Sequence, residues 1–343
     1  RRQRQMCIRD SYSMADLSSL NLVKGKKRFK ILSIDGGGIK GLYSAEVLAK
    51  FEEIYQCRIS DHFDLICGTS TLTIIALGIS LGIPMSDICK FYTQHGPRIF
   101  CADKQRNKWG RRQYFIKQLL GKGKYSQKDL EDALYSVFKD KKICESNNLL
   151  CIPAYNITTA EPRIFKKDYE NLTEDDSKRY VDIALATAAA PTYFPVKEIN
   201  NHCYIDGGVW ANNPTLVGLT EYIFKISTDP NYRGVDILSI SSIVKPTGER
   251  HGRKERSFRH WGSKLFDSYT VGQSFFTDFF LKQLINVVKF PMTYLRVQHK
   301  PLSVDQMSII DMDTADKNVL KLLTAIGPVS YTHLRAHETR HDL

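Results

Sequence analysis

A serine, an aspartate and a run of glycines each stand directly after an apolar segment of the chain. Ser70 lies in CGTSTLTIIALG at 67–78, Asp206 lies in YIDGGV at 204–209, and the glycines lie in DGGGIKG at 35–41. A serine with a suitably placed base can attack an acyl carbon, and closely spaced backbone N–H groups can stabilise the oxyanion that then forms. These residue types therefore predict acyl transfer or hydrolysis, if the fold brings the three segments together.

Ser70 has three interpretations. With Gly68 two residues earlier it nearly matches the nucleophile elbow G-x-S-x-G, a sharp turn between strand and helix, but Leu72 stands where the pattern has its second glycine. A serine between a strand and a helix is also a common helix N-cap. A serine in an incomplete motif can instead be the remnant of a lost active site. The residues alone leave these alternatives open.

The glycine-rich segment could bind an anion through its backbone. Glycines let main-chain N–H groups approach a ligand oxygen, and a helix N-terminus, predicted here, favours negative charge. The segment could hold a phosphate or stabilise an oxyanion, and a plain tight turn is the remaining alternative. A P-loop is excluded because no Lys-Ser or Lys-Thr pair follows at the required spacing, and the glycines match G-x-G-x-x-G poorly.

A nucleophilic serine needs a base, and Asp206 is a better candidate than the nearby histidines. His62 and His202 stand in no motif, and His202 is expected at the start of the strand that ends at Asp206. At about 3.3 Å per residue, that places it some 13 Å from the strand's end. Asp206 has glycines beside it that give close access, although an aspartate base would need a raised pKa.

Apolar segments alternate with amphipathic ones along the chain. Short apolar runs predict strands at 27–34, 63–67, 149–157, 202–206 and 234–244. Helical spacing predicts helices at 42–56, 73–82, 126–138, 180–194 (ended by Pro191) and 274–290. This alternation predicts an α/β fold, a mainly parallel central sheet with helices on both faces in three layers, plus extra helices. Because ligand sites lie at the carboxyl ends of parallel strands, we expect the three polar segments to meet at one edge.

The composition predicts a cytoplasmic protein without a metal or cofactor. The 343 residues are 42% hydrophobic and 25% charged, and no apolar run reaches the ~20 residues of a membrane span. No signal peptide is expected. The eight cysteines form no C-x-x-C pair and no cluster with histidine at metal-ligand spacing, so we interpret them as reduced thiols.

The two ends of the sequence differ from the rest. Residues 1–13 and 329–343 lack apolar periodicity and resemble translated sequencing-adapter read-through, so we expect a non-native leader and tail around a single domain at 14–328. That domain has its core motifs at 27–244 and a helical C-terminal part at 245–328. The leader carries a net +3 and the tail none, so +9 of the chain's +12 remains. This excess favours an anionic partner: a membrane surface, a nucleotide or a nucleic acid.

DGGGIKG, GTST and DGGVWANNP, in this order, resemble the patatin-like phospholipase family, as does AAAPTYFP at 188–195. The similarity runs from about residue 27 to residue 244. It implies a Ser-Asp dyad without histidine, Ser70 and Asp206, in a phospholipase A-type hydrolase of acyl esters of glycerophospholipids. The resemblance assigns an oxyanion hole to the backbone of Gly36, Gly37 and Gly38, and support of the motifs to Lys40, Gly41, Gly68, Gly207 and Gly208.

The resemblance also implies partners. A phospholipase of this family acts at the phospholipid membrane surface as a peripheral protein, and no nucleic acid is expected. The chain is also similar to bacterial members of the family that include the cyclic-nucleotide-activated phospholipases of anti-phage defence. That similarity implies a cyclic nucleotide as activator.

Two stretches depart from the family pattern. Leu72 and Thr73 replace glycines after the serine, and Ser241, Ser242 and Ile243 stand where the family often has LSxGTG. The missing glycines sit where backbone crowds backbone, so we expect a folded protein in which Leu72 displaces Ser70 and depresses activity. The alternatives are a non-catalytic fold that binds lipid or protein, and another serine acyl hydrolase such as a thioesterase.

Two further segments have more than one interpretation. The basic run 245–260 is a solvated loop, or a contact for lipid head groups or a nucleotide through Lys245, Arg250, Arg253, Lys254, Arg256 and Arg259. The helix with Phe275, Phe276, Phe279 and Phe280 is a core helix or the face of a homodimer, or else part of an acyl pocket or an interfacial surface.

Overall fold

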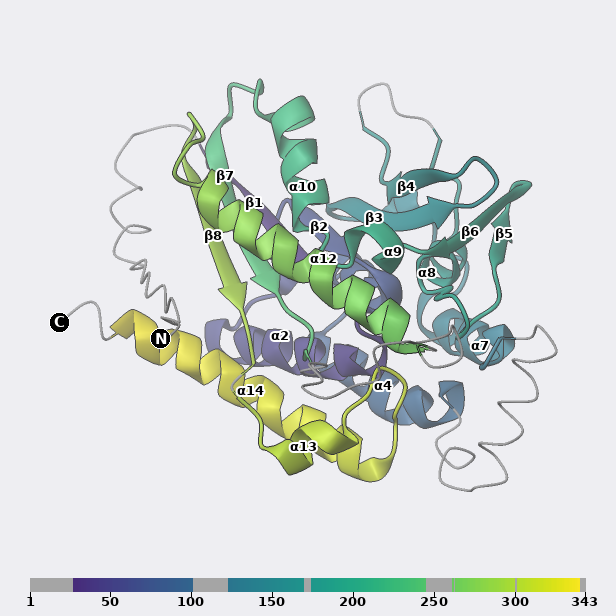
Figure 1. Cartoon of the computed structure of the whole chain (residues 1–343). Helices are drawn as coiled ribbons and strands as arrows, with labels where there is room; N and C mark the ends of the chain where they lie inside the picture. Colours follow the sequence, from purple (N-terminus) through teal and green to yellow (C-terminus); the bar gives the residue numbers. More distant parts are fainter. Residues whose placement is uncertain are drawn as a thin grey trace, which may run out of the picture.

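A mixed eight-stranded sheet forms the centre of the protein (Figure 1). The structure is a computed structural model that describes residues 27–100, 123–169, 174–244, 261, 263–299 and 301–339. The strands follow the order β5-β6-β3-β2-β1-β7-β8, and β4 pairs with β3. Their bounds are β1 Lys27–Ile34, β2 Leu65–Gly68, β3 Leu149–Asn156, β4 Glu161–Lys166, β5 Lys197–Ile199, β6 His202–Asp206, β7 Tyr232–Ile240 and β8 Met292–Val297.

The sheet has a parallel part and an antiparallel margin. β3, β2, β1, β7 and β8 run parallel to one another, whereas β4 and β6 are antiparallel to β3, and β5 is antiparallel to β6. Strands covered on both faces read as nearly continuous apolar runs, which is why β1, β2 and β3 stand out in the sequence. The expected α/β fold with a largely parallel sheet is confirmed, and the antiparallel margin is an addition to it.

Helices cover both faces of the sheet (Figure 1). The larger core contains α2 Gly41–Tyr55, α3 Thr73–Ser80, α4 Met85–Ile99, α7 Gln127–Phe138, α8 Tyr180–Thr187 and α14 Lys317–Thr339. The smaller core on the other face contains α9 Gly208–Ala211, α10 Thr215–Glu221 and α12 Ser263–Leu284. Because side chains alternate along a strand, Ile31 of β1 enters the smaller core and Leu32 the larger one.

Two expectations about element bounds are corrected. The helix predicted to end at Pro191 ends at Thr187 instead, because the Ala189 carbonyl leaves the helix to accept the N–H of Asp206 at 3.0 Å. The C-terminal part was expected to be helical, yet residues 292–297 form β8, which pairs with β7 as a further parallel strand. Short helix α13 Val304–Ile309 precedes α14, which continues past Pro328 to Thr339.

Some expectations fall on residues that the structure does not describe. The predicted leader 1–13 lies there, and so do the basic residues Arg250, Arg253, Lys254 and Arg256 with the rest of 245–260. Within the described ranges, no helix combines the length and the apolar character that crossing a bilayer requires.

Candidate active site

The sheet register brings the three polar segments together. Ile34, the last residue of β1, pairs with Gly68, the last residue of β2, so the glycine-rich loop and the turn at Ser70 start side by side. Asp206 also ends its strand, but the strand runs antiparallel to β3, contrary to the parallel arrangement assumed from the sequence. Asp206 pairs with Ala154, close to the carboxyl end of β3, and this level of the sheet places it beside Ser70.

Ser70 occupies a sharp turn between β2 and α3. Its φ of +60° lies in the left-handed region, which a residue other than glycine adopts at a cost and which is common at functional sites. Gly68 permits the tight turn, because a Cβ there would lie 2.9 Å from Ala76 Cβ of the following helix. The Ser70 hydroxyl does not cap a helix: it donates to Asp206 Oδ2 at 2.6 Å. The geometry is therefore that of an elbow, and the N-cap interpretation is wrong.

The threonines around Ser70 join the elbow to the other two segments. Thr69 Oγ1 donates to the Ala211 carbonyl at 2.7 Å, next to the Asp206 segment, and Thr71 Oγ1 donates to the Gly38 carbonyl at 2.9 Å in the glycine-rich loop. Thr187 of α8 accepts the Ser70 N–H at 3.1 Å and donates to the Pro153 carbonyl at 2.6 Å. All these hydroxyls are buried, so the position of Ser70 is fixed by bonds that water does not weaken.

Asp206 is buried and has a raised pKa. Its side chain is 1% exposed, its Oδ2 accepts from Ser70, and its Oδ1 accepts the Gly208 N–H at 2.7 Å. Burial raises the pKa of the carboxyl to about 7, and the two hydrogen bonds oppose this only in part. A base whose pKa lies near neutrality can take up a proton and release it again within one reaction cycle.

The raised pKa predicts an acid limb in the rate profile. If Asp206 is the base for Ser70, it must be ionised to accept the proton, and kcat/KM should fall about tenfold per pH unit below the pKa of about 7. Initial rates measured from pH 4 to pH 9 at constant ionic strength would check this. An inflection near pH 4 would contradict it, because it would indicate a carboxyl in contact with water.

Each glycine of the loop faces an atom that a side chain would displace. A Cβ on Gly36 would lie 2.5 Å from Asn212 Oδ1, one on Gly37 would lie 2.1 Å from Ser242 Oγ, and one on Gly38 would lie 2.0 Å from the Met312 carbonyl oxygen. Gly38 also has a φ of +63°. The same Gly36 Cβ would lie 3.3 Å from Ser70 Cβ, so the loop passes directly beside the elbow.

The loop leaves two backbone donors for an oxyanion rather than the expected three. The Gly36 N–H already donates to the Asn212 carbonyl at 2.8 Å, which corrects its assignment to an oxyanion hole. The N–H groups of Gly37 and Gly38 have no hydrogen-bond partner within the described ranges. Ser242 Oγ, against Gly37, is buried and likewise has no partner among the described residues. The stretch 241–243 thus lies along this loop.

The other motif residues hold these segments in place. Lys40 Nζ donates to the Ile243 carbonyl at 2.9 Å, so its side chain joins the glycine-rich loop to the stretch 241–243 that follows β7. A Cβ on Gly41 would lie 2.5 Å from the Tyr92 hydroxyl, and one on Gly207 would lie 2.2 Å from the Pro153 carbonyl oxygen. Gly208 supplies the N–H that Asp206 accepts.

Neither His62 nor His202 is placed to act as the base in place of Asp206. His202 opens β6, where its Nδ1 lies 3.3 Å from Asn156 Nδ2, and the His62 ring packs against Phe51 with a centroid separation of 5.5 Å. In the part of the chain that the structure describes, no hydrogen bond joins either imidazole to Ser70 or Asp206. Within the same part, no group of three or more His, Cys, Asp or Glu side chains could hold a metal ion.

Leu72 does not crowd the elbow as the sequence suggested. Its backbone is in the ordinary right-handed region, with a φ of −78°, and its fully buried side chain belongs to the larger core. Ser70 keeps its hydrogen bond to Asp206 beside it. The expected displacement of Ser70 is therefore absent, and the room for the leucine comes from the core beneath α3.

Because Leu72 fills part of the core, a glycine at this position should destabilise the fold rather than relieve crowding at Ser70. We expect Leu72→Gly to lower the free energy of unfolding by about 3–5 kcal/mol, because it leaves a cavity and adds backbone freedom to the unfolded chain. Leu72→Met, which conserves volume, should cost less than about 1.5 kcal/mol. Urea denaturation of the three proteins measures this. A glycine variant that is as stable as the wild type and has a higher hydrolytic rate would show that Leu72 does crowd Ser70.

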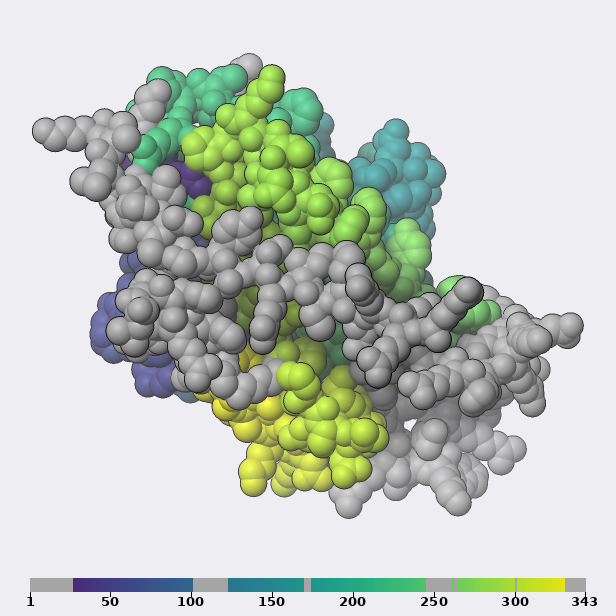
Figure 2. Space-filling view, turned by 60° about the vertical axis from the view of Figure 1, so that its left-hand side comes forward, coloured from purple at the N-terminus to yellow at the C-terminus, as the bar shows by residue number. Residues whose placement is uncertain are grey.

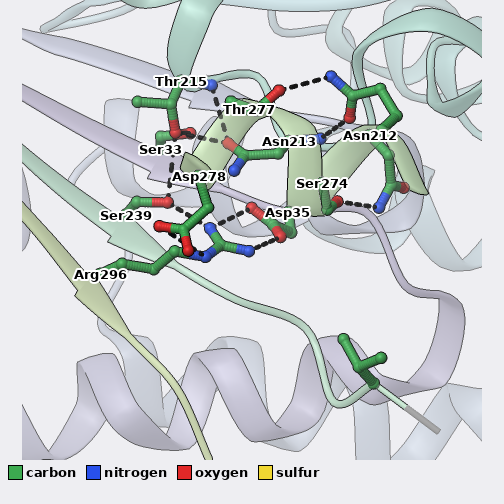
Figure 3. Close-up of polar contacts among 12 residues, drawn as sticks. Ser33, Asp35, Asn212, Asn213, Thr215, Ser239, Ser274, Thr277, Asp278 and Arg296 are labelled. Carbon is green, nitrogen blue, oxygen red and sulfur yellow. Dashed lines mark hydrogen bonds and ion pairs between the residues drawn. The ribbon is translucent and has the colours of Figure 1, made fainter. Parts of the chain in front are cut away.

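A buried polar network behind the glycine-rich loop was not predicted (Figure 3). Arg296 of β8 points at Asp35 and donates to both carboxylate oxygens, to Oδ1 at 3.0 Å, and it also donates to Ser239 Oγ at 2.6 Å. The Arg296 and Asp35 side chains are 6% and 2% exposed. Because Asp35 directly precedes Gly36, this ion pair anchors the start of the loop to β8.

Helix α12 completes this network with its inner face. Asn212 Nδ2 donates to Ser274 Oγ at 2.9 Å (Figure 3). Gln273 Oε1 accepts the Asn213 N–H at 2.8 Å. The same Asn212 presents Oδ1 to Gly36 and its carbonyl to the Gly36 N–H. The asparagines belong to the DGGVWANNP motif, and nothing in the sequence identifies their partners on α12.

The phenylalanines of α12 are not core residues. Phe275, Phe276, Phe279 and Phe280 are 62%, 63%, 61% and 41% exposed, so the core interpretation is wrong for these four side chains.

The fold and the site together fit the class of α/β acyl hydrolases. A buried carboxylate accepts from a serine hydroxyl, and the glycine-rich loop beside the serine has backbone N–H groups without a partner among the described residues.

Comparison with known proteins identifies the family within this class. Residues 32–219, more than half of the chain, match the family model described as patatin-like phospholipase. Over 330 residues the chain is 31% identical to a cGAMP-activated phospholipase of Pseudomonas aeruginosa (strain BWHPSA011 / Pa011), covering 92% of this chain and 94% of that protein. It is 29% identical to Patatin-like protein 2 of Arabidopsis thaliana, covering 91% and 88%. The chain belongs to the patatin-like phospholipase family, and is thus a lipid acyl hydrolase by family.

A solved structure is similar at lower identity. Human GIVD cytosolic phospholipase A2 in complex with methyl gamma-linolenyl fluorophosphonate is 10% identical, with a TM-score of 0.42, and the match covers 95% of this chain and 62% of that one.

Proposed function

We propose that the protein is a phospholipase A-type hydrolase of glycerophospholipids in which Ser70 is the nucleophile and Asp206 the base. The observation that carries the proposal is the 2.6 Å hydrogen bond from Ser70 Oγ to the buried Asp206 carboxylate. The pKa of about 7 suits the base, and the left-handed turn at Ser70 is the strained conformation expected of a nucleophile elbow.

The reaction needs one proton acceptor that is used twice. Asp206 Oδ2 takes the proton from Ser70 Oγ as that oxygen bonds to the ester carbonyl carbon, and the Gly37 and Gly38 N–H groups donate to the resulting oxyanion. The C–O bond to the glycerol side then breaks, and the departing oxygen takes the proton from Asp206. Water attacks the acyl-serine and gives its proton to Asp206, which returns it to Ser70 as the fatty acid leaves.

The substrate class and the serine mechanism are tested separately. Incubation with mixed phospholipids should release fatty acids and lysophospholipids, detected by mass spectrometry, and Ser70→Ala should release none. A fluorophosphonate probe should label the wild type but not Ser70→Ala, because only an activated serine reacts. Labelling without phospholipid products, but with hydrolysis of acyl thioesters, would replace the phospholipase by a thioesterase.

The membrane surface is the proposed place of action, with the protein held peripherally on the cytoplasmic side. The net charge of +9 that remains without the leader and tail, out of +12 for the whole chain, supports attraction to anionic lipid. A homodimer remains a proposal that light scattering tests directly.

We also propose regulation by a cyclic nucleotide. The support is the likeness to a relative described as a cGAMP-activated phospholipase, over nearly the full length of both chains. Phospholipid hydrolysis should rise on addition of cGAMP, and the corresponding linear dinucleotide is the control. Equal rates with cGAMP, with the linear dinucleotide and without either would contradict this regulation while leaving the hydrolase proposal intact.

A further inference from the structure

Helix α12 packs on the sheet with its more polar face inward and its apolar face outward. Its buried face is mostly polar and consists of Thr270, Ser274, Thr277, Asp278 and Leu281. Its exposed face carries six apolar side chains, here called the aromatic stripe: Leu265, Tyr269, Phe275, Phe276, Phe279 and Phe280. Two uncharged polar residues of the helix, Ser268 and Gln283, are exposed as well. Helices at a protein surface ordinarily turn the apolar side inward, so this arrangement requires a reason for each face.

The inner face has a reason within the protein. Ser274 and Gln273 bind Asn212 and the Asn213 backbone beside the glycine-rich loop, and Asp278 accepts from the Tyr294 hydroxyl at 2.9 Å. These buried polar contacts fix the rotation of the helix about its axis. The aromatic stripe must then face outward, and Figure 2 shows the green atoms of this part of the chain at the surface.

The stripe is large for an exposed apolar surface. The four phenylalanines alone leave an area on the order of 450 Å² uncovered, given side chains of roughly 200 Å². Patches of a few hundred Å² usually mark an interaction site on a protein or a membrane. At Gly272, between Tyr269 and Phe275, a Cβ would meet nothing within 4 Å, so the described residues leave this stretch open.

Charge along the exposed face favours an anionic lipid surface. From residue 265 to residue 280 no exposed residue of α12 is charged: of the two acidic residues there, Asp267 is half-buried and Asp278 is buried. The exposed charged residues that follow are Lys282 at the end of the helix and Lys289 beyond it. Lys282 Nζ donates to Asp278 Oδ2 at 2.9 Å, and its side chain is still 56% exposed. Phenylalanine on the embedded face with lysine beside it is the composition of helices that lie flat in a membrane interface.

We propose that the aromatic stripe docks the protein on a bilayer containing anionic lipid, with α12 lying along the interface. The stripe runs from residue 265 to residue 280 of α12, so at 1.5 Å per residue it gives a contact about 24 Å long. Ser274 touches Asn212 of the site from the opposite face of the helix, so docking brings the site to within about one helix diameter, ~10 Å, of the lipid. The biological role of this docking rests on the proposed function. The docking surface itself is inferred only from the stripe.

A second copy of the chain fits the stripe less well. A stable protein interface buries about 800 Å² on each partner, more than the roughly 650 Å² that the six side chains of the stripe leave exposed at roughly 200 Å² each. Exposed lysines beside the stripe suit anionic head groups and offer no charge complement to another lysine-bearing stripe. The lipid surface is therefore the occupant that the charges and the area both favour.

Vesicle binding of inactive protein tests the proposal independently of hydrolysis. In the Ser70→Ala background, Phe276→Ser/Phe279→Ser should bind about tenfold less tightly to vesicles of phosphatidylcholine with phosphatidylglycerol, because two exposed apolar anchors are lost. The matched control is Tyr55→Ser, an exposed aromatic of α2 on the other face of the sheet, which should bind as before. Circular dichroism checks that all three proteins are folded.

The possible results test the docking surface and the proposed hydrolase function independently of each other. Unchanged vesicle binding by Phe276→Ser/Phe279→Ser would overturn the inference, as would light scattering that shows a dimer lost in this variant while vesicle binding remains. Stripe-dependent binding by a wild type that hydrolyses no ester would support the inference and refute the hydrolase. In protein that keeps Ser70, hydrolysis of vesicle phospholipid that is unaffected by Phe276→Ser/Phe279→Ser would support the hydrolase and refute the docking surface.

Discussion

Asp206→Asn is expected to lower kcat by about 10⁴-fold, and Ser70→Ala by a similar factor. The amide keeps the shape of the carboxyl and can still accept the Gly208 N–H, but it cannot take the Ser70 proton. The two residues act as one unit, so the double variant should be no slower than either single variant. Steady-state hydrolysis of phospholipid at pH 8 measures all three.

The asparagine variant should also be more stable than the wild type at alkaline pH. The folded protein holds the Asp206 proton up to a pKa of about 7, whereas the unfolded chain releases it near 3.8. Wild-type stability therefore falls as pH rises from about 4 to 7. At pH 8 Asp206→Asn should gain up to about 4 kcal/mol, with no gain below pH 4.

Loss of activity together with a gain of stability would exclude unfolding as the cause of inactivity. Urea denaturation at pH 4 and pH 8 supplies the second half of this test. Near-normal turnover by Asp206→Asn, combined with loss of turnover in His62→Ala or His202→Ala, would show that a histidine is the base and that the dyad is wrong.

The sequence could predict the segments of the site because each follows a buried strand. β1, β2 and β3 are apolar on both faces, which makes them visible as short runs, and the glycines and Ser70 stand where those runs stop. The direction of β6 could not be read in this way. Only its last three residues alternate between buried and half-buried, and such a pattern fits a parallel or an antiparallel neighbour equally well.

Long-range polar partners account for most of what the sequence missed. Periodicity indicated that the phenylalanines of α12 share a face, but the inward side of that helix is chosen by Asn212 and Asn213, some 60 residues earlier in the chain. Strand β8 is only partly buried and contains exposed Leu295, so it lacks the apolar run of the central strands. The strand that contains Arg296 could therefore not be recognised in the sequence. Its ion pair with Asp35, the residue before the glycines, could not be predicted either.

Arg296→Met is expected to lower the free energy of unfolding by about 3–5 kcal/mol near neutral pH. Methionine fills much of the same space, but it leaves the Asp35 carboxylate, 2% exposed, without the guanidinium that donates to both of its oxygens. Burial raises the pKa of Asp35, and Arg296 opposes that rise. Adding Asp35→Asn should recover part of the loss, because an uncharged amide costs less to bury than an unpaired carboxylate.

The same substitution should reduce kcat more than it changes KM. Asp35 directly precedes Gly36, so loss of its anchor lets the donors at Gly37 and Gly38 shift, and a shift of about 1 Å at such a site can cost on the order of 10²-fold in rate. Arg28→Met is the matched control, because Arg28 pairs with Asp236 at the far end of β1, where the side chains are 10% and 21% exposed. That variant should lose less stability and keep its kcat. If both arginine variants lost kcat equally, the effect would come from general destabilisation of the sheet, and Arg296 would have no particular role in positioning the loop.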